Sequence, residues 1–314
     1  MQNFAIAGVA GYVAQRHLQA IHDTGNKLVA AVDPHDAVGI LDRFSFDVRF
    51  FTEVERFDRH LEKLRRGPQA GRINYLSICS PNYLHDAHIR LALRVGADAI
   101  CEKPLVINPW NLDALEELEI ETGRRIFAIL QLRLHPGLLE LKAQMEQRSN
   151  AVHDVCLTYV TARGPWYDVA WKGSEERSGG LVANIGIHLF DLLLWMFGPA
   201  NKSEVHLREK RRAAGFIELD RARVRWFLSS DISDLPFAAV PGRRTSHRSM
   251  SIDGTEVEFS DGMSELHTRA YEDILAGRGL GTRDARPAIE LVHQIRSVDL
   301  SADVRTPHPM LAGR

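Results

Sequence analysis

Short apolar runs alternate with amphipathic stretches along the first 130 residues, and this alternation restricts the possible folds more than any other feature of the chain. The runs have the length of buried strands and are Phe4–Gly8, Leu28–Val32, Arg49–Phe51, Tyr75–Cys79, Ala97–Cys101 and Ile126–Leu130. The stretches between them have helical spacing and are Tyr12–Asp23, Val54–Arg66, Leu84–Val95 and Asn111–Thr122. Strands that alternate with helices predict a parallel sheet wound with helices on both faces.

The pattern changes after about Pro136. Helices are expected at Pro136–Gln147, Gly180–Phe197, Leu266–Ala276 and Ala285–Asp299. Strands are expected at Asp154–Arg163, Val205–Glu209, Phe216–Leu219, Val224–Leu228, His247–Ile252 and Glu256–Phe259. Because several of these strands follow one another without a helix between them, they predict a mostly antiparallel sheet. The tail Arg305–Arg314 is expected to be loose.

The length and charge of the chain narrow the choice of function. A chain of 314 residues is long enough for two domains, and 39 Lys and Arg against 41 Asp and Glu give a net charge of -2. Without a global positive field, neither nucleic acid nor an anionic membrane surface is an expected partner. Three widely separated cysteines fit a reducing compartment, so we expect a cytoplasmic protein. No histidine or cysteine spacing typical of a zinc site occurs, and no metal is expected.

The segment Ser178–Asn201 is about as long as a membrane span, with Asp191 as its only full charge. In a helix, Asn184, His188 and Asp191 fall at i, i+4 and i+7 and share one stripe. An aspartate near the centre of a span costs roughly 2.5 to 3.5 kcal/mol. A buried helix with one polar face is therefore favoured over a membrane span.

The turn after the first predicted strand has small residues where a dinucleotide would bind. Gly8 and Gly11 form a GxxGxxA pattern that opens a helix, and a helix N-terminus with bare backbone can hold a pyrophosphate. A tight turn between strand and helix would need the same residues. Asp33 ends the next strand, 22 residues beyond Gly11, where a carboxylate can accept hydrogen bonds from a ribose. Such an acid repels a 2′-phosphate, so NAD is favoured over NADP.

Two further strand ends carry polar groups at the edge where doubly wound sheets bind ligands. Ser80, Asn82 and His85 follow the strand Tyr75–Cys79, and Glu102-Lys103-Pro104 follows the strand Ala97–Cys101. Lys103 is either a solvated charge or a functional cation that faces the cofactor. Glu102 either orients its neighbours or pairs with a nearby base.

Three motifs together resemble the glucose–fructose oxidoreductase, inositol dehydrogenase and rhizopine catabolism family. They are Gly8–Ala14, the triplet Glu102-Lys103-Pro104, and Ser178-Gly-Gly with Asn184, Gly186, His188 and Asp191 in order behind it. The resemblance covers nearly the whole chain. It implies a Rossmann domain over residues 1–130 and, over residues 131–314, a substrate-binding and oligomerising α/β domain with a mainly antiparallel open sheet. It also implies a dimer or tetramer.

The resemblance implies roles for individual residues. Lys103 and His188 are the implied catalytic pair. Histidine has an unperturbed pKa of ~6.5 and suits the acceptance of a hydroxyl proton, with Lys103 stabilising the alkoxide; the reverse assignment stays open. Where many relatives carry an aspartate, this chain has Asn184, whose amide can orient a sugar hydroxyl but cannot take its proton.

The implied binding residues fall into two groups. Those for the cofactor are Gly8, Gly11, Tyr12, Val13, Asp33, Ser80, Asn82, His85, Glu102, Lys103, Gln131, Trp171 and Lys172. Those for the substrate are Lys103, Arg133, Arg163, Tyr167, Asn184 and His188. Either of the two arginines could hold a carboxylate, and each could equally form an ion pair within the protein. Arg243 and Arg244 are a further pair that could meet a diphosphate or remain solvated.

Within the family, three stretches resemble the bacterial members that oxidise the 3-hydroxyl of UDP-2-acetamido-2-deoxy-glucuronate in lipopolysaccharide O-antigen sugar synthesis. They lie at residues 7–42, 78–105 and 130–136. The resemblance implies NAD as cofactor, a UDP-linked N-acetylated uronate as substrate, and 2-oxoglutarate as a candidate for NADH recycling. Two alternatives stay open: a dehydrogenase of another sugar or cyclitol, and a dinucleotide-sensing regulator without turnover.

Overall fold

The computed structural model describes residues 1–147, 151–240, 245–257, 259, 265–302 and 304–311. Arg243, Arg244 and part of the predicted strand Glu256–Phe259 lie outside these residues. The chain forms two compact units. The N-terminal unit comprises Met1–Gln131 and Ser264–Arg286, and the C-terminal unit comprises Leu132–Met263 and Pro287–Arg314. The sequence-based division at residue 130 differs from this one for 265–286, a segment whose helix Leu266–Leu275 packs with the first sheet through Tyr271 and Phe4.

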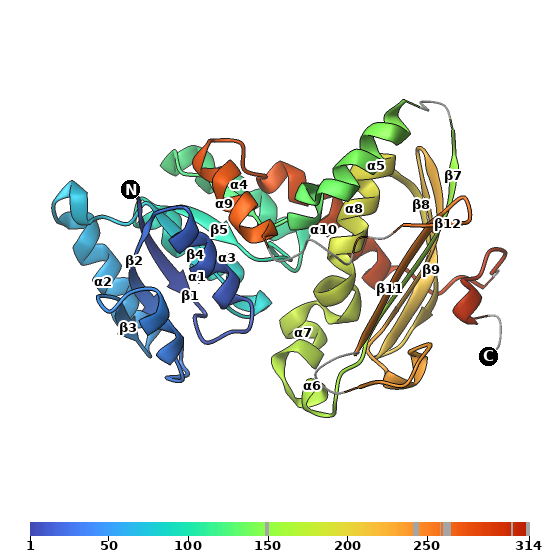
Figure 1. Ribbon diagram of the computed structural model, residues 1–314, viewed down its shortest axis with the longest axis horizontal. Helices are drawn as coiled ribbons and strands as arrows, with labels where there is room; N and C mark the ends of the chain where they lie inside the picture. The colour runs from blue at the N-terminus through green and yellow to red at the C-terminus, as the bar shows by residue number, and fades with distance from the viewer. Residues whose placement is uncertain (148–150, 241–244, 258, 260–264, 303, 312–314) are drawn as a thin grey trace. The chain divides into compact units, whose positions relative to one another are not determined.

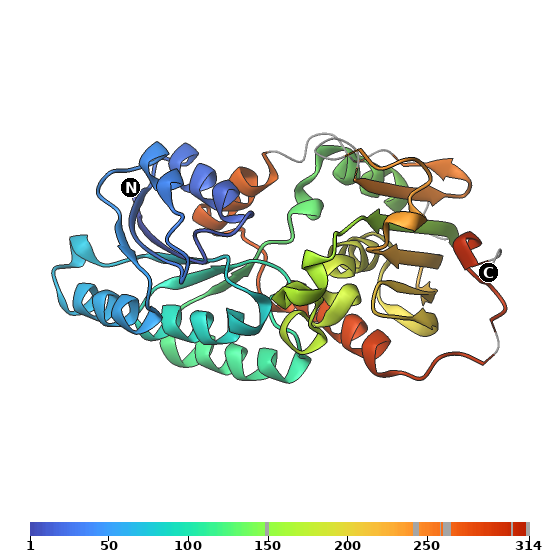
Figure 2. The same cartoon turned by 90° about the horizontal axis from the view of Figure 1, so that it is seen from below.

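A six-stranded parallel sheet forms the N-terminal unit, in the order β3-β2-β1-β4-β5-β6. Its strands are β1 (Asn3–Ala7), β2 (Lys27–Val32), β3 (Arg49–Phe51), β4 (Tyr75–Ile78), β5 (Asp98–Cys101) and β6 (Ile126–Ala128). Figure 2 shows helices on both faces of this sheet. They include α1 (Ala14–Asp23), α2 (Val54–Arg66), α3 (His85–Arg94), α4 (Pro109–Thr122) and α9 (Leu266–Leu275). The predicted doubly wound parallel sheet is confirmed.

The second sheet belongs to the C-terminal unit and has the order β12-β11-β7-β10-β9-β8. Its strands are β7 (His153–Thr161), β8 (Ala200–Arg208), β9 (Arg212–Leu219), β10 (Ala222–Ser229), β11 (Ser246–Ile252) and β12 (Thr255–Glu256). Only the β7–β10 pairing is parallel. The mainly antiparallel sheet predicted for the C-terminal half is therefore confirmed (Figure 1).

Helices of the C-terminal unit include α5 (Pro136–Glu146), α8 (Ile187–Phe197) and most of α10 (Thr282–Ser297). Helix α8 packs on one face of the second sheet, with Phe190 edge-on to Trp226 of β10 at 5.3 Å. The described part of the chain holds one helix long and apolar enough to cross a membrane, Glu175–Phe197, and 78% of its most apolar window is buried. Such burial is what the core helix of a globular domain shows, as the sequence favoured.

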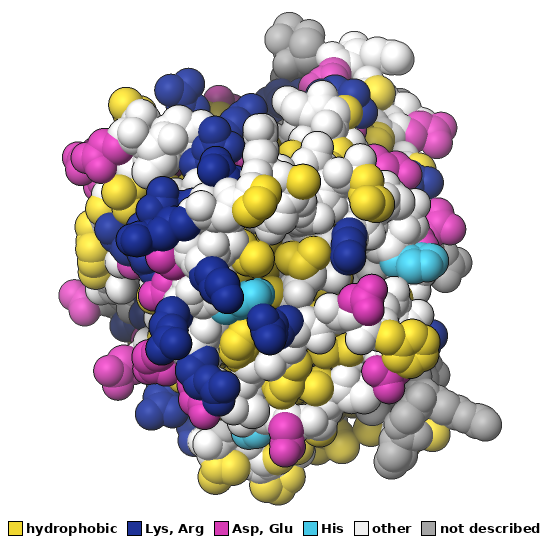
Figure 3. Space-filling view, turned by 90° about the vertical axis from the view of Figure 1, so that its left-hand side faces the viewer, with side chains coloured by type: hydrophobic (Ala, Val, Ile, Leu, Met, Phe, Trp, Pro, Cys, Tyr) yellow, Lys and Arg dark blue, Asp and Glu magenta, His cyan; other side chains and the backbone are white. Residues whose placement is uncertain are grey.

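Basic side chains on the surface stand beside acidic ones. Figure 3 shows one face of the molecule, on which Lys and Arg side chains gather in the left and central part of the view with Asp and Glu scattered among and around them. On α2, for example, the Glu62 carboxylate pairs with Arg65 at 2.7 Å and with Arg66 at 2.6 Å. Exposed pairs of this kind contribute little to stability, because solvent screens them.

The C-terminal tail is docked on the second sheet where the sequence predicted a loose segment. His308 is 1% exposed and stacks on Phe227 at 5.6 Å, on the face of β10 opposite Trp226. Its Nε2 lies 3.1 Å from the Thr158 hydroxyl, and its Nδ1 accepts from the backbone N–H of Met310. The prediction was wrong for this part of the tail, because one buried aromatic contact holds it.

Docking of the tail should weaken as the pH falls. Burial lowers the pKa of His308 to about 4, whereas a free histidine has about 6.5. The docked state holds neutral His308, so its stabilisation is complete above about pH 6.5 and declines as the pH falls toward 4, by about 2 kcal/mol at pH 5. The melting temperatures of wild type and His308→Gln should therefore draw closer together as the pH is lowered from about 7 to about 5, because only wild type loses this stabilisation. The same substitution at exposed His22 should show no such convergence, and parallel curves for His308→Gln would contradict the assignment.

Candidate active site

The turn after β1 brings the ends of three strands together. Gly8 has φ +83°, and a Cβ there would lie 2.5 Å from the backbone nitrogen of Ser80. The Gly8 N–H donates to the carbonyl of Val32, at the end of β2, at 2.8 Å. Only glycine fits this conformation and this close approach without displacing the backbone after β4. The structure therefore contains the predicted turn with uncovered backbone. Gly11 lies in the same turn, before α1 begins.

Asp33 is fixed against that turn. Its carboxylate is 6% exposed and accepts the backbone N–H of Ala10 at 3.0 Å and that of His35 at 2.9 Å. Each oxygen keeps a second lone pair that a ribose hydroxyl could use. A glycine cradle, a helix N-terminus and an acceptor carboxylate at the edge of one parallel sheet fit an NAD molecule.

The turns after β4 and β5 are joined by His85. Its Nδ1 lies 2.8 Å from the carbonyl of Pro104, and its Nε2 lies 2.9 Å from the carbonyl of Ser80. Burial lowers the pKa of His85, although the two carbonyl acceptors offset part of that effect. The Ser80 hydroxyl also contacts His88 Nδ1 at 2.8 Å. These contacts fix the backbone of the two turns that carry the predicted cofactor residues Ser80, Glu102 and Lys103.

The remaining predicted residues of the N-terminal unit differ in exposure. Tyr12 is 82% exposed at the start of α1, whereas Asn82 is 5% and Gln131 6% exposed. Lys103 is partly exposed in the turn after β5. Tyr12 and Lys103 are thus accessible to a ligand of this unit.

In the C-terminal unit, a buried helix presents two polar side chains. From Leu181 to Phe197 the helix is buried except at Asn184, His188 and Trp195, which keep intermediate exposure. Residues Val182–Gly186 form a π-helical turn, a feature often found at functional sites. Asn184 and His188 lie four residues apart, so the one polar face predicted from the sequence is present. Asp191 is buried instead, at 2% exposure.

A segment of short helices stands next to Asn184. In α6 (Trp166–Val169), the Tyr167 hydroxyl accepts a hydrogen bond from the Asn184 amide at 3.2 Å. Burial raises the pKa of Tyr167. Trp171 and Lys172 follow in one 3₁₀ turn, with the Lys172 ammonium 5.6 Å from the Trp171 ring. Burial, and then the charge of Arg163, lower the pKa of Lys172. Arg163, Tyr167, Lys172 and Asn184 therefore form one polar group.

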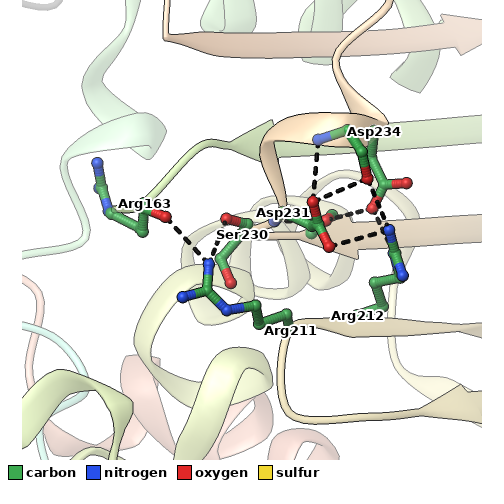
Figure 4. A network of polar contacts seen from close by, with 8 residues as sticks. Arg163, Arg211, Arg212, Ser230, Asp231 and Asp234 are labelled. Atoms are coloured by element: carbon green, nitrogen blue, oxygen red, sulfur yellow. Dashed lines mark hydrogen bonds and ion pairs between the residues drawn. The ribbon is translucent and has the colours of Figure 1, made fainter. Parts of the chain in front are cut away.

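Arg211 holds the segment that carries Arg163. Figure 4 shows the Arg211 guanidinium donating to the Arg163 carbonyl, at 3.0 Å, and to the Ser230 carbonyl. Arg211 also pairs with the Asp168 carboxylate in α6 at 2.5 Å. The Arg163 side chain itself points away from this network in Figure 4. Arg211 did not stand out in the sequence, since its three partners are 48, 43 and 19 residues away.

Arg133, an expected substrate residue, is in a buried ion pair. Its Nε and Nη2 donate to the two carboxylate oxygens of Asp191 at 3.0 and 2.6 Å. The Asp191 side chain is 2% exposed and that of Arg133 12%. This is the ion-pair alternative that the sequence left open, and its geometry suits a role in holding α8 in place.

Removing Arg133 should therefore destabilise the fold strongly. Arg133→Met leaves the Asp191 carboxylate buried without its cation, which costs about 3–5 kcal/mol of unfolding free energy. Arg94→Met, which breaks the exposed pair with Asp58, should cost less than about 1 kcal/mol. Denaturant unfolding of the two variants measures the difference. Equal costs would show that the buried pair contributes no more than a surface one.

Comparison with known protein families gives a separate match for the N-terminal part and for the C-terminal part of the chain. An oxidoreductase family with an NAD-binding Rossmann fold matches residues 2–129, and the C-terminal alpha/beta domain of that family matches residues 151–239. The chain belongs to this oxidoreductase family. Residues 2–129 are thus its NAD-binding domain, as the motifs predicted.

Two solved structures match the chain at full length. The WlbA (WbpB) dehydrogenase of Thermus thermophilus, in complex with NAD and alpha-ketoglutarate, is 50% identical, with TM-score 0.93, over 99% of this chain and 100% of that one. The same dehydrogenase in complex with NAD and UDP-GlcNAcA has TM-score 0.92. The WlbA dehydrogenase of Bordetella pertussis, at 18% identity and TM-score 0.74, shares the fold.

Curated members of the family match over a shorter region. The D-glucoside 3-dehydrogenase of Escherichia coli is 32% identical over 134 residues, which are 41% of this chain and 37% of that protein. The chain thus spans about two fifths of the length of the first curated relatives it matches.

Proposed function

We propose that this protein is an NAD-dependent dehydrogenase that oxidises the 3-hydroxyl of UDP-2-acetamido-2-deoxy-D-glucuronate to a ketone, in lipopolysaccharide O-antigen sugar synthesis. The observation that carries the proposal is the full-length match, at 50% identity, to a dehydrogenase crystallised with NAD and UDP-GlcNAcA. The glycine turn, Asp33, and the partly exposed pair Asn184 and His188 support it, since they supply a dinucleotide cradle and polar groups for a sugar. A cytoplasmic location suits such a substrate.

The chemistry divides between two side chains. The glycine turn and Asp33 would hold NAD, which when bound would supply the hydride acceptor for C3 of the sugar. His188 takes the proton of the 3-hydroxyl on its imidazole, and the Lys103 ammonium stabilises the alkoxide as it develops. Asn184 donates from its amide to a sugar oxygen, and its bond to Tyr167 sets the direction of that amide. The reverse assignment of Lys103 and His188 uses the same two groups.

The anionic parts of the substrate need cations in the C-terminal unit. Arg163 and Lys172 are the better candidates than Arg133, whose guanidinium is committed to Asp191. Among the residues that the structure describes, no ion pair is found for the Arg163 side chain. A guanidinium can hold a carboxylate through two parallel hydrogen bonds. Arg163 is therefore proposed to bind the uronate carboxylate.

A panel of nucleotide sugars tests the substrate. UDP-GlcNAcA should exceed UDP-GlcNAc, which lacks the carboxylate, by at least about 100-fold in kcat/KM, because the latter leaves a binding cation without its partner. Arg163→Met should reduce this preference, whereas Arg225→Met, a cation of the same unit paired with Asp154, should preserve it. UDP-glucuronate, which lacks the acetamido group, serves as the second comparison. Equal rates for the uronate and UDP-GlcNAc would exclude the uronate assignment.

The reduced cofactor is proposed to be recycled by a 2-oxo acid. Support comes from the alpha-ketoglutarate bound with NAD in the Thermus thermophilus dehydrogenase. The carbonyl carbon of 2-oxoglutarate would gain a hydride and its oxygen a proton, giving 2-hydroxyglutarate. Lys103 and His188 can return the proton that the sugar released, and the same cations can hold the acid.

A further inference from the structure

The carboxylate of Glu102 is the centre of a buried hydrogen-bond network in the N-terminal unit. Its Oε1 lies 3.0 Å from Nε2 of His17 and 3.0 Å from Nε2 of His267. Its Oε2 accepts the backbone N–H of Lys103 at 3.2 Å. The side chains of the two histidines are 0% and 2% exposed, and that of Glu102 is 8% exposed. One carboxylate therefore accepts three hydrogen bonds away from water.

The direction of each hydrogen bond follows from the chemistry of the groups. An ionised carboxylate only accepts, so both histidines carry their proton on Nε2. In a neutral ring, Nδ1 of His17 is then an acceptor, and the Tyr271 hydroxyl, at 2.7 Å, donates to it. The Ser77 hydroxyl, at 2.6 Å, donates to Tyr271. The donors run in one sense, from Ser77 through Tyr271 and His17 to Glu102.

The charge states agree with this direction. Burial lowers the pKa of His17 and raises the pKa of Tyr271 well above its ordinary value, so the ring is neutral and the phenol keeps its proton. Burial alone would raise the pKa of Glu102, but the hydrogen bonds from His17 and His267 outweigh it and hold that pKa well below its ordinary value. The network is therefore a buried anion that accepts hydrogen bonds from His17, from His267 and from the Lys103 N–H, an arrangement in which each bond strengthens the next.

The network joins elements that serve the cofactor and the reaction. His17 lies on α1, which starts just after the glycine turn, and Glu102 follows β5 directly before Lys103. His267 and Tyr271 lie on α9, in the segment that returns to the N-terminal unit from the later part of the chain. A single carboxylate thus connects the dinucleotide helix, the turn of Lys103 and α9.

We propose that His17, His267 and Tyr271 are positioning residues for Lys103, and that they act through Glu102. The converging donors fix the carboxylate, and the carboxylate holds the backbone N–H of Lys103 and so the backbone that carries the Lys103 side chain. The inference rests on the proposed dehydrogenation, in which Lys103 meets the reacting hydroxyl. It gives Glu102 a supporting role in place of the cofactor contact that the family resemblance implied.

Nitrogen NMR of the histidine rings tests the network without cofactor or substrate. His17 and His267, assigned by loss of their signals in His17→Gln and His267→Gln, should both carry a proton on Nε2, and His17 should have none on Nδ1. Glu102→Gln should shift both Nε2–H signals. A proton on Nδ1 of His17, or an Nε2 without a proton in either ring, would overturn the proposal; the second pattern would indicate a cation among these three ligand atoms, which lie within 4.8 Å of one another.

Kinetics test the action on Lys103. Glu102→Gln replaces one acceptor oxygen with an amide NH2 group, which must face either the Lys103 peptide N–H or the two histidines. Either arrangement breaks a hydrogen bond and misplaces the Lys103 side chain. We therefore expect kcat to fall by about 10- to 100-fold, with the KM for the sugar unchanged. In the Lys103→Met background the same change should cause no further loss, because residues that act as a unit are not additive. A loss of the same size in both backgrounds would show a purely structural role and overturn the proposal.

A matched variant separates this effect from general damage to the fold. His153 is also a buried histidine bound to a carboxylate, Asp253, at 2.7 Å, and it lies in the C-terminal unit. His153→Gln should lower the melting temperature without changing kcat. If wild type shows no turnover with any nucleotide sugar, the proposed function fails while the histidine NMR result still decides on the network.

Discussion

Replacing Lys103 with methionine, or His188 with asparagine, should slow the reduction of NAD by UDP-GlcNAcA by about 10²- to 10⁴-fold and leave NAD binding intact. Each side chain is proposed to act on the 3-hydroxyl, and a positioned acid or base contributes about 10²- to 10⁴-fold to the rate. Neither change removes the glycine turn or Asp33, so the cofactor should bind as before. Single-turnover kinetics and a separate NAD titration measure the two properties.

Surface variants of the same type provide the controls for this result. Lys63→Met on α2 and His22→Asn on α1 remove exposed side chains and should leave turnover unchanged. Comparing how kcat depends on pH in wild type and in Lys103→Arg then tests whether Lys103 or His188 takes the proton. Wild-type rates in Lys103→Met or in His188→Asn would show that the catalytic residue has been misassigned.

Gly8→Ala should weaken NAD binding by at least about 100-fold and destabilise the N-terminal unit by about 2–4 kcal/mol. The added Cβ would lie 2.5 Å from the Ser80 nitrogen and 2.6 Å from the Cys79 carbonyl carbon, and φ there is +83°. Both contacts are with backbone, so relief requires a shift of the turn or of the strand end behind it. Either shift displaces the backbone to which a pyrophosphate would bind.

Gly25→Ala is the matched control for that change. Gly25 also has a left-handed φ, +70°, but no atom lies within 4 Å of the position its Cβ would take. Only the conformational cost remains, about 1 kcal/mol, and NAD affinity should stay the same. If the two variants unfolded at the same denaturant concentration, the close approach at Gly8 would have no energetic importance.

The sequence predicted the features that depend on local pattern. Strand and helix alternation gave the first sheet because each βα unit is encoded within a short stretch of chain. The spacing of Asn184 and His188 placed both on one helix face, and the structure shows them partly exposed on a helix that is otherwise buried. Likewise, Gly8 was recognisable because a turn between strand and helix needs a residue without a Cβ.

Features that depend on distant contacts were not predictable in this way. His17 and His267 are 85 and 165 residues from Glu102, and nothing near either histidine in the sequence indicates a carboxylate partner. The pattern of 266–276 predicted a helix but not the sheet on which that helix packs. The tail was expected to be loose because chain ends commonly are, yet the ring of His308 is buried on Phe227.

The proposed NAD-dependent oxidation is tested most directly by absorbance at the band of reduced nicotinamide after the protein is mixed with NAD and UDP-GlcNAcA. The band should rise in wild type, rise about 10²- to 10⁴-fold more slowly in Lys103→Met and His188→Asn, and fall again when 2-oxoglutarate is added. No rise with this or any other nucleotide sugar, in protein that binds NAD, would contradict it and favour a dinucleotide sensor without turnover.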